Sequence, residues 1–256
     1  MNRNEVFRAF WIFFFLSFLA PGCSSGRWAH LSYNDPSAYG NFNQKRMIFL
    51  APVSGETEWF SNLDSFLPDL FAEMRIDIYW RSSLYLKDRL SESQKKSLEM
   101  LQSSFQKGQL ESAYLADIAP AIDGASIMFI NVDSYHDVTK REMRTEFVPK
   151  TDGSGQSEFR DIWADYQDQS MYARVEIWQS GEQKKMIGID YSYKVSGRSG
   201  QSVEGGCLGA IAGAITQLVV GKSLRAMGLR PSPGTAEDVV VIFSRAITDH
   251  IPRPRR

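Results

Sequence analysis

Two hydrophobic spacings alternate along this chain, and together they restrict its fold to a sheet covered by helices. Residues 171–178 (MYARVEIW) and 186–195 (MIGIDYSYKV) alternate apolar and polar side chains, which is the period of a half-buried strand. Polar residues 180–183 lie between them, so the pair predicts an antiparallel hairpin. Residues 61–75 instead place apolar side chains three and four positions apart, as on one helix face. The sequence therefore predicts an α/β (α+β) fold, a single mixed-sheet domain flanked by helices.

Further segments predict the remaining elements of this domain. Short apolar runs predict strands at residues 46–52, 76–80 and 126–133. Apolar residues at helical spacing predict helices at residues 91–106, 110–118 and 235–250. Ser91 and Gln94 have the spacing of a capping box, which predicts where the first of these helices begins. Proline disfavours a helix interior, so Pro68 predicts that the helix within residues 61–75 begins near Ser65.

The N-terminus has the layout of an export signal. Arg3 and Arg8 precede an apolar run at residues 9–20 (AFWIFFFLSFLA). As a helix this run would be about 18 Å long, whereas the hydrocarbon core of a bilayer is about 30 Å thick. A signal peptide is therefore favoured over a membrane-spanning anchor.

The residues after this run end in Gly22-Cys23 and resemble the lipobox of bacterial lipoproteins, although Ala20 and Pro21 depart from its usual pattern. The resemblance implies cleavage between Gly22 and Cys23, a diacylglycerol on the Cys23 thiol, and a fatty acid such as palmitate on the new amine. Ser24 follows the cysteine, and a serine at this position resembles the signal that sorts lipoproteins of enteric-type bacteria to the outer membrane. An ordinary secretory signal and an uncleaved anchor are the alternatives.

This interpretation divides the chain into three parts. Residues 1–22 are the signal peptide, residues 23–45 are the lipidated N-terminus and a tether, and residues 46–256 are the periplasmic α/β domain. The expected location is the bacterial outer membrane, lipid-anchored on its periplasmic side. Cys207 is the second cysteine of the chain, so a Cys23–Cys207 disulfide is an alternative to lipidation.

Composition and motifs favour binding over catalysis. The chain carries 29 Lys and Arg against 30 Asp and Glu, which argues against a nucleic-acid partner. The three histidines lie far apart in the sequence, and no catalytic or phosphate-binding motif is present. We therefore predict no enzyme activity, no metal site and no cofactor. A hydrolase built on Ser134, His136 and Asp137 is a third, less favoured class.

Residues 137–170 are polar and acidic, and they predict an insertion or long loop within the domain. Trp163 and Tyr166 within this segment are candidate partner-binding aromatics, because these residue types are enriched in interfaces. Phe159 is a further, less favoured candidate of the same kind, and a local mini-core formed by these aromatics is the alternative.

Residues 205–221 form a Gly/Ala-rich segment in which Gly205, Gly209 and Gly213 recur every four residues. On a helix these glycines share one face and allow another backbone to approach closely. Three interpretations stay open: packing inside the domain, an oligomer or membrane contact, and a Gly-rich loop.

The order of these elements resembles small α/β periplasmic lipoproteins related to the penicillin-binding-protein activators, the curli secretion lipoprotein and the N-terminal domain of the Tol-system propeller protein. The resemblance rests on the strand ending in Phe49-Leu50-Ala51-Pro52, the helix after it, and the late pair of strands. It implies a non-enzymatic binding, scaffolding or activating component of an envelope complex. The alternative is a homo-oligomeric subunit of a secretion or trafficking assembly.

Overall fold

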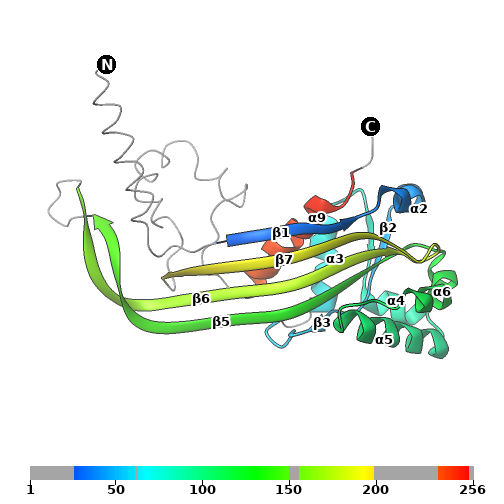
Figure 1. The fold of residues 1–256 in the computed structure, drawn as a ribbon, viewed down its shortest axis with the longest axis horizontal. Coiled ribbons are helices and arrows are strands. Elements are labelled where there is room, and N and C mark those ends of the chain that lie inside the picture. The colour runs from blue at the N-terminus through cyan, green and yellow to red at the C-terminus, as the bar shows by residue number, and fades with distance from the viewer. Residues whose placement is uncertain (1–25, 61–62, 150–155, 199–235, 254–256) are drawn as a thin grey trace, which may run out of the picture. The chain divides into compact units, whose positions relative to one another are not determined.

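The computed structural model describes residues 26–60, 63–149, 156–198 and 236–253, and it confirms the mixed α/β fold class. One open sheet has the strand order β1-β7-β6-β5-β2-β4, and β3 also pairs with β5 (Figure 1). The strands are β1 (Gly26–Asn34), β2 (Met47–Leu50), β3 (Ser54–Gly55), β4 (Tyr79–Arg81), β5 (Ser126–Pro149), β6 (Ser157–Gln179) and β7 (Lys184–Arg198). The helices are α2 (Tyr39–Lys45), α3 (Leu63–Met74), α4 (Ser83–Arg89), α5 (Glu92–Gln106), α6 (Leu115–Ile118) and α9 (Ala236–His250).

Contacts divide the described chain into two compact units. We call the first the hairpin unit; its described residues are 137–149, 156–169 and 194–198. We call the second the α/β body; it comprises Gly26–His136, Ser170–Tyr193 and residues 236–253. Strands β5, β6 and β7 each contribute residues to both units.

Parallel pairing organises the centre of the α/β body. Strand β2 lies between β4 and β5 and is parallel to both, with Ile48 opposite Trp80 on one side and Ser126 on the other. Parallel neighbours require crossover connections, and the helices of the chain supply them. Both faces of β2 are consequently covered, which explains why Ile48, Phe49 and Leu50 are all buried.

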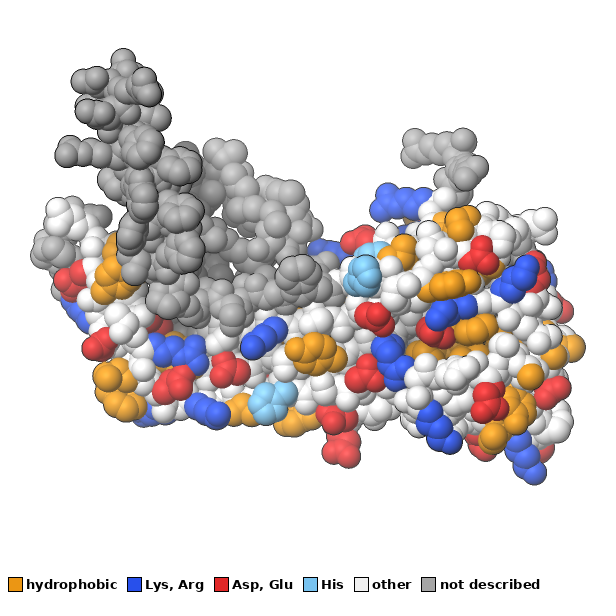
Figure 2. Space-filling model, in the orientation of Figure 1, with side chains coloured by type: hydrophobic (Ala, Val, Ile, Leu, Met, Phe, Trp, Pro, Cys, Tyr) orange, Lys and Arg blue, Asp and Glu red, His pale blue; other side chains and the backbone are white. Residues whose placement is uncertain are grey.

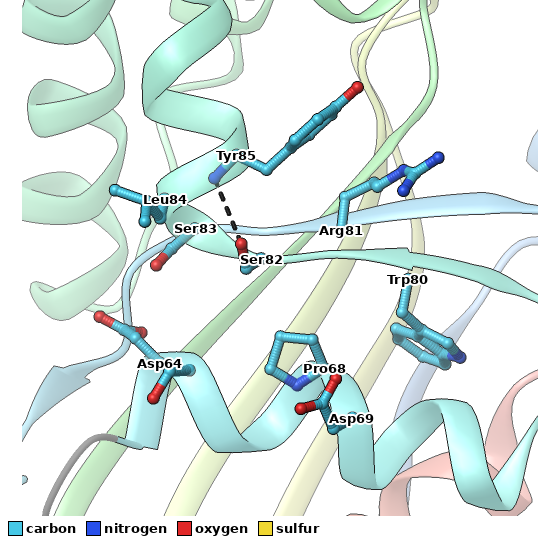
Figure 3. A pocket seen from close by; sticks show the side chains of 10 residues that line it. Asp64, Pro68, Asp69, Trp80, Arg81, Ser82, Ser83, Leu84 and Tyr85 are labelled. Atoms are coloured by element: carbon cyan, nitrogen blue, oxygen red, sulfur yellow. Dashed lines mark hydrogen bonds between the residues drawn. The ribbon is translucent and has the colours of Figure 1, made fainter.

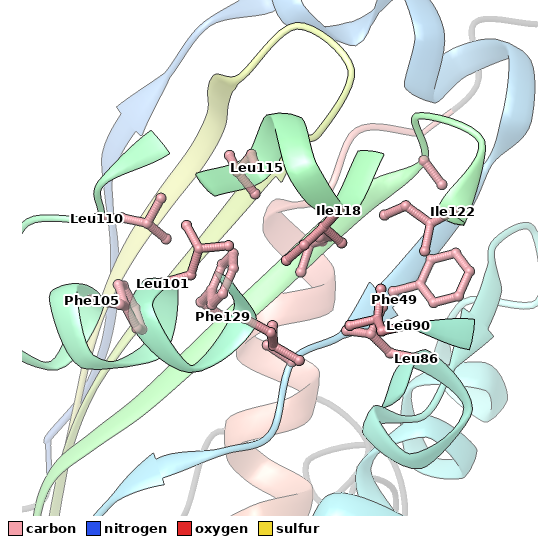
Figure 4. Packing of buried hydrophobic residues seen from close by; sticks show 14 residues of the cluster. Phe49, Leu86, Leu90, Leu101, Phe105, Leu110, Leu115, Ile118, Ile122 and Phe129 are labelled. Atoms are coloured by element: carbon pink, nitrogen blue, oxygen red, sulfur yellow. The ribbon is translucent and has the colours of Figure 1, made fainter. Parts of the chain in front are cut away.

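The two faces of this sheet have separate helical covers. Phe49 and Phe129 point into a cluster with apolar side chains of α4, α5 and α6 (Figure 4). Ile48 alternates with Phe49 and therefore faces the other way. On that second face the Trp80 ring lies 4.8 Å from the ring of Phe71 on α3, and α3 contacts α9.

The first residues of α5 and α3 show how far local sequence signals determine where a helix begins. The capping box of α5 is confirmed, since Ser91 Oγ accepts from Gln94 N and Gln94 Oε1 accepts from Ser91 N at 2.9 Å. The predicted start of α3 near Ser65 is wrong, because the helix already begins at Leu63 and contains Pro68. Burial of one apolar face of α3 outweighs the helical hydrogen bond that Pro68 cannot donate.

Residues 26–45 do not form the predicted tether. They form β1, a short 3-10 turn and α2, and Asp35 N donates to Met186 O of β7 at 2.9 Å. A Cβ at Gly188 would lie 3.1 Å from Ser32 Oγ, so the glycine allows the two strands this close approach. The prediction failed because an edge strand can gain its hydrogen bonds from a neighbour while its side chains stay polar.

The predicted insertion or long loop over residues 137–170 is also wrong, because residues 137–149 belong to β5 and residues 157–170 belong to β6. Its polar side chains pair across the strands: Thr145 Oγ1 donates to Asp161 Oδ1 at 2.6 Å, and Tyr166 OH donates to Glu146 Oε1 at 2.6 Å. Cross-strand pairs of this kind stabilise a sheet without an apolar core.

An arginine–carboxylate cluster fixes the end of α9 in the body. The buried Arg75 guanidinium donates to Ile251 O at 2.7 Å and to Pro252 O at 2.9 Å. Its Nε also donates to Asp77 Oδ1 at 2.8 Å, and Arg46 pairs with the same carboxylate. The hydrogen bond from Arg75 holds the pKa of Asp77 down to about 2.

Candidate functional site

The hairpin unit exposes a row of large apolar side chains. Phe159 is 70% exposed, Trp163 63%, Met143 53% and Phe147 38%. All four have odd numbers on their strands, so each strand presents its two to one face of the hairpin. We call these four residues the hairpin row.

Two contacts set the register of β5 and β6 within this row. Thr145 bonds to Asp161, and the rings of Phe147 and Phe159 lie 5.0 Å apart. Residue numbers rise on β5 as they fall on β6, so the strands are antiparallel and Met143 lies opposite Trp163. The row therefore consists of two apolar cross-strand pairs, Met143–Trp163 and Phe147–Phe159, separated by the polar pair Thr145–Asp161.

Tyr166 does not share this surface with Trp163. They are three positions apart, an odd offset, so they point to opposite faces of β6. Tyr166 is 3% exposed, and the Arg144 guanidinium lies 4.2 Å from the centre of its ring. The structure thus places Trp163 on an open surface and Tyr166 in a polar network.

This network fastens the face that carries Tyr166. Arg144 pairs with Glu142, lies 3.7 Å from Asp168 and donates to Ser196 Oγ of β7 at 3.0 Å. Three strands of the hairpin unit are tied together by one guanidinium. Because these strands are held together, the hairpin row rests on an ordered support, and binding loses less conformational entropy.

Sequence reasoning missed a second candidate, a groove of about 380 Å³ beside β4 in the α/β body (Figure 3). Arg81 and Tyr85 lie on one side of it, and residues of α3 lie on the other. The full lining is Asp64, Ser65, Pro68, Asp69, Trp80, Arg81, Ser82, Ser83, Leu84 and Tyr85. Ser82 caps α4 by accepting from Tyr85 N at 3.2 Å, and this cap holds the Tyr85 backbone beside the strand end.

The two walls of the groove differ in charge. Arg81 lies 5.0 Å from the centre of the Tyr85 ring, and its buried Nε has no hydrogen-bond acceptor among the described residues. On the opposite wall Asp64 Oδ1 accepts from Val53 N at 2.8 Å, and Asp69 is exposed. The groove therefore pairs a cationic, aromatic wall with an acidic one.

The other predicted residues lie outside the described part of the chain or along β5. Gly22, Cys23, Gly205, Gly209 and Gly213 lie outside the described residues. Ser134, His136 and Asp137 lie along β5, and Asp137 accepts from Gln167 Nε2 at 2.8 Å and Gln169 Nε2 at 2.9 Å. Within the described ranges, no three His, Cys, Asp or Glu side chains could hold a metal ion together.

In the part of the chain that the structure describes, every helix is too short or too polar to cross a bilayer. The face drawn in Figure 2 carries acidic and basic side chains close together, with hydrophobic side chains between them.

Comparison with known proteins identifies no family. No family model matches the chain, and no curated protein matches it. Among solved structures it is similar to lipoprotein GNA1162 from Neisseria meningitidis, with 12% identity over 68% of this chain and 96% of that one. The TM-score is 0.33, so this likeness carries no argument about the present chain.

Proposed function

We propose that this protein is a lipid-anchored lipoprotein of the bacterial outer membrane that binds another envelope protein on the periplasmic side and acts without catalysis. The hairpin row is the observation that carries the proposal. The Gly22-Cys23 pair and the resemblance to activator lipoproteins support the location and the kind of work.

The hairpin row has the properties of a binding surface. Single exposed apolar residues are common, whereas several large ones gathered on one face mark sites of interaction. Trp163 and Phe159 each expose more than half of their surface on one face of β6, four positions apart, and each has an apolar residue of β5 opposite it. Tryptophan is enriched among residues that dominate binding energy, so we place Trp163 at the centre of the interface.

Charge around the row indicates the partner's chemistry. Asp161 and Asp165 are exposed on the same face of β6, and Arg141 is exposed on the corresponding face of β5. Complementary potentials favour encounter and suppress wrong partners. The expected partner surface is apolar at its centre and mainly basic at its rim.

The corrected N-terminus shortens the reach of the proposed anchor. Strand β1 begins at Gly26, the third residue after Cys23. Three extended residues span about 10 Å, so a lipid on Cys23 would hold the α/β body next to the membrane surface.

Two experiments test the proposal. The first is intact-mass analysis of the mature N-terminus, in which the wild type begins at acylated Cys23 and Cys23→Ala carries no lipid and leaves the membrane fraction. A wild-type chain that begins elsewhere, or that has no fatty chain, would refute the anchor.

The second experiment is crosslinking in living cells with p-benzoylphenylalanine in place of Trp163, and in place of the exposed Met100 of α5 as the control. We expect position 163 to give one adduct with an identified envelope protein, reduced by Phe159→Ala, and position 100 to give none. An adduct with a second copy of this chain would favour the oligomeric subunit instead. Equal labelling from both positions would refute the hairpin row as the binding surface.

A further inference from the structure

We propose that the groove beside β4 binds an extended peptide segment that carries one acidic side chain, with the peptide added to the free edge of β4 and its carboxylate on Arg81. The site uses residues of the α/β body alone and is independent of the function proposed for the hairpin row.

The edge of β4 supplies the backbone contacts. β4 is the last strand of the sheet order and has β2 as its neighbour. Tyr79 N donates to Arg46 O at 2.7 Å, at the start of the pairing with β2. Backbone groups of successive strand residues point to opposite sides, so the N–H and C=O of Trp80 face the free edge. Such an edge is a template for an added strand.

Arg81 supplies the charge that selects the ligand. Its guanidinium is stacked on Tyr85, and its Nε is buried without an acceptor among the described residues. A buried donor that lacks its partner is unfavourable, and a carboxylate can satisfy two guanidinium N–H groups at once. The Arg89 guanidinium lies 5.1 Å from the centre of the same Tyr85 ring, and Arg89 Nη2 donates to Tyr85 OH at 3.1 Å, which holds the ring in place.

The acidic wall restricts where the ligand carries its charge. Asp64 already accepts from the Val53 backbone, and Asp69 lies one turn further along α3. A second acid on the ligand would face these carboxylates and be repelled. The favoured segment therefore carries its carboxylate toward Arg81 and neutral or basic side chains toward α3.

Apolar surface and size complete the fit. Leu84, in the lining, is 67% exposed, and Tyr79 lies on the same strand face as Arg81. A volume of about 380 Å³ lies within the usual range of ligand sites. It accommodates a few side chains of a strand, and the three residues of β4 limit the backbone pairing to a short segment.

The test uses the full chain in detergent micelles and a panel of capped hexapeptides of alternating Thr and Val, in which a single Glu is moved through the six positions. Isothermal titration measures each peptide and its Gln counterpart. We expect one Glu position to bind about tenfold more tightly than its Gln counterpart, as a charge-assisted hydrogen bond provides, and N-methylation of alternate peptide amides to weaken it.

Three protein variants make the result specific. Arg81→Gln should abolish the tenfold preference, Arg81→Lys should keep part of it, and Lys87→Gln on the exposed side of α4 should leave it unchanged. Thermal melting of each variant confirms that it is folded. Equal binding of Glu and Gln peptides, or no binding at millimolar concentration, would overturn the proposal. So would self-association that Arg81→Gln abolishes, because a second copy would then occupy the edge.

Discussion

The two ends of β5 share one strand but face different surroundings. In the α/β body, Ile127, Met128, Phe129 and Ile130 are successive residues and all are buried, because helices cover both faces. In the hairpin unit, Met143 and Phe147 are exposed on one face while Arg144 and Glu146 form contacts on the other. Packing explains the apolar residues of the first end, but it does not explain those of the second.

This difference separates stability from recognition. The body end holds its place by excluding water from apolar surface, which is the dominant favourable term in folding. The hairpin end holds its place by cross-strand polar pairs, each of modest net value. Large apolar side chains that contribute little to folding are therefore available for a partner.

The largest expected effect on stability comes from replacing a phenylalanine by alanine at each of the two ends of the sheet in turn. Phe129→Ala should lower the free energy of unfolding by about 3–5 kcal/mol, because it opens a cavity beside Phe105 in the core. Phe159→Ala should lower it by less than about 1 kcal/mol, since the ring is largely exposed. Urea denaturation measures both variants, and equal losses would remove the distinction between the two ends.

The next effect concerns the point where β3 meets the buried end of β5. Gly55 has a φ of +91°, and a Cβ there would lie 2.0 Å from Val132 O. Gly55→Ala should therefore destabilise the body by about 1–3 kcal/mol. Gly40→Ala is the matched control, because nothing lies within 4 Å of its Cβ and alanine favours the helix. A neutral Gly55→Ala would show that β3 can move away from β5.

A smaller effect concerns the pH dependence of the body. The pKa of Asp77 falls from 3.8 to about 2 in the folded protein. Its contribution is therefore fully present above pH 4 and is lost as the pH falls toward 2. Because the side chain is 31% exposed, we expect only about 1–2 kcal/mol. Urea denaturation at pH 7 and pH 2.5 should show this loss in wild type and a smaller one in Asp77→Asn. An equal loss in both would remove the assigned role.

The smallest expected effect on stability distinguishes the Tyr166 face of the hairpin unit from the face that carries the hairpin row. Tyr166→Phe removes one hydrogen bond, to Glu146, and should destabilise the hairpin unit by about 1 kcal/mol. Amide hydrogen exchange along residues 139–148 measures this local change. The variant should leave partner crosslinking from position 163 unchanged, and a loss of the adduct would place the partner on the Tyr166 face instead.

The sequence predicted those elements whose signals are local. The capping box at Ser91 and the alternation in residues 171–195 each depend on neighbours in the chain, and both appear as expected. Strand β1 and the outer half of β5 were missed, because their hydrogen bonds come from other strands and their side chains are mostly polar.

The candidate surfaces were predictable to different degrees. Trp163 was recognised from its residue type, but its separation from Tyr166 required knowing that both lie on a strand. The groove beside β4 had no sequence signal, because residues of α3 meet Arg81 only after the chain has folded. Register and tertiary proximity are the information that single-sequence patterns lack.

The most direct measurement is the affinity of the crosslinked partner, once purified, for wild type, Trp163→Ala and Tyr166→Phe. A central tryptophan contributes at least about 2 kcal/mol to many interfaces, so Trp163→Ala should weaken binding by about thirtyfold while Tyr166→Phe leaves it within about twofold. Unchanged affinity in Trp163→Ala, with the variant folded and lipid-anchored, would contradict the assignment of the hairpin row as the binding surface.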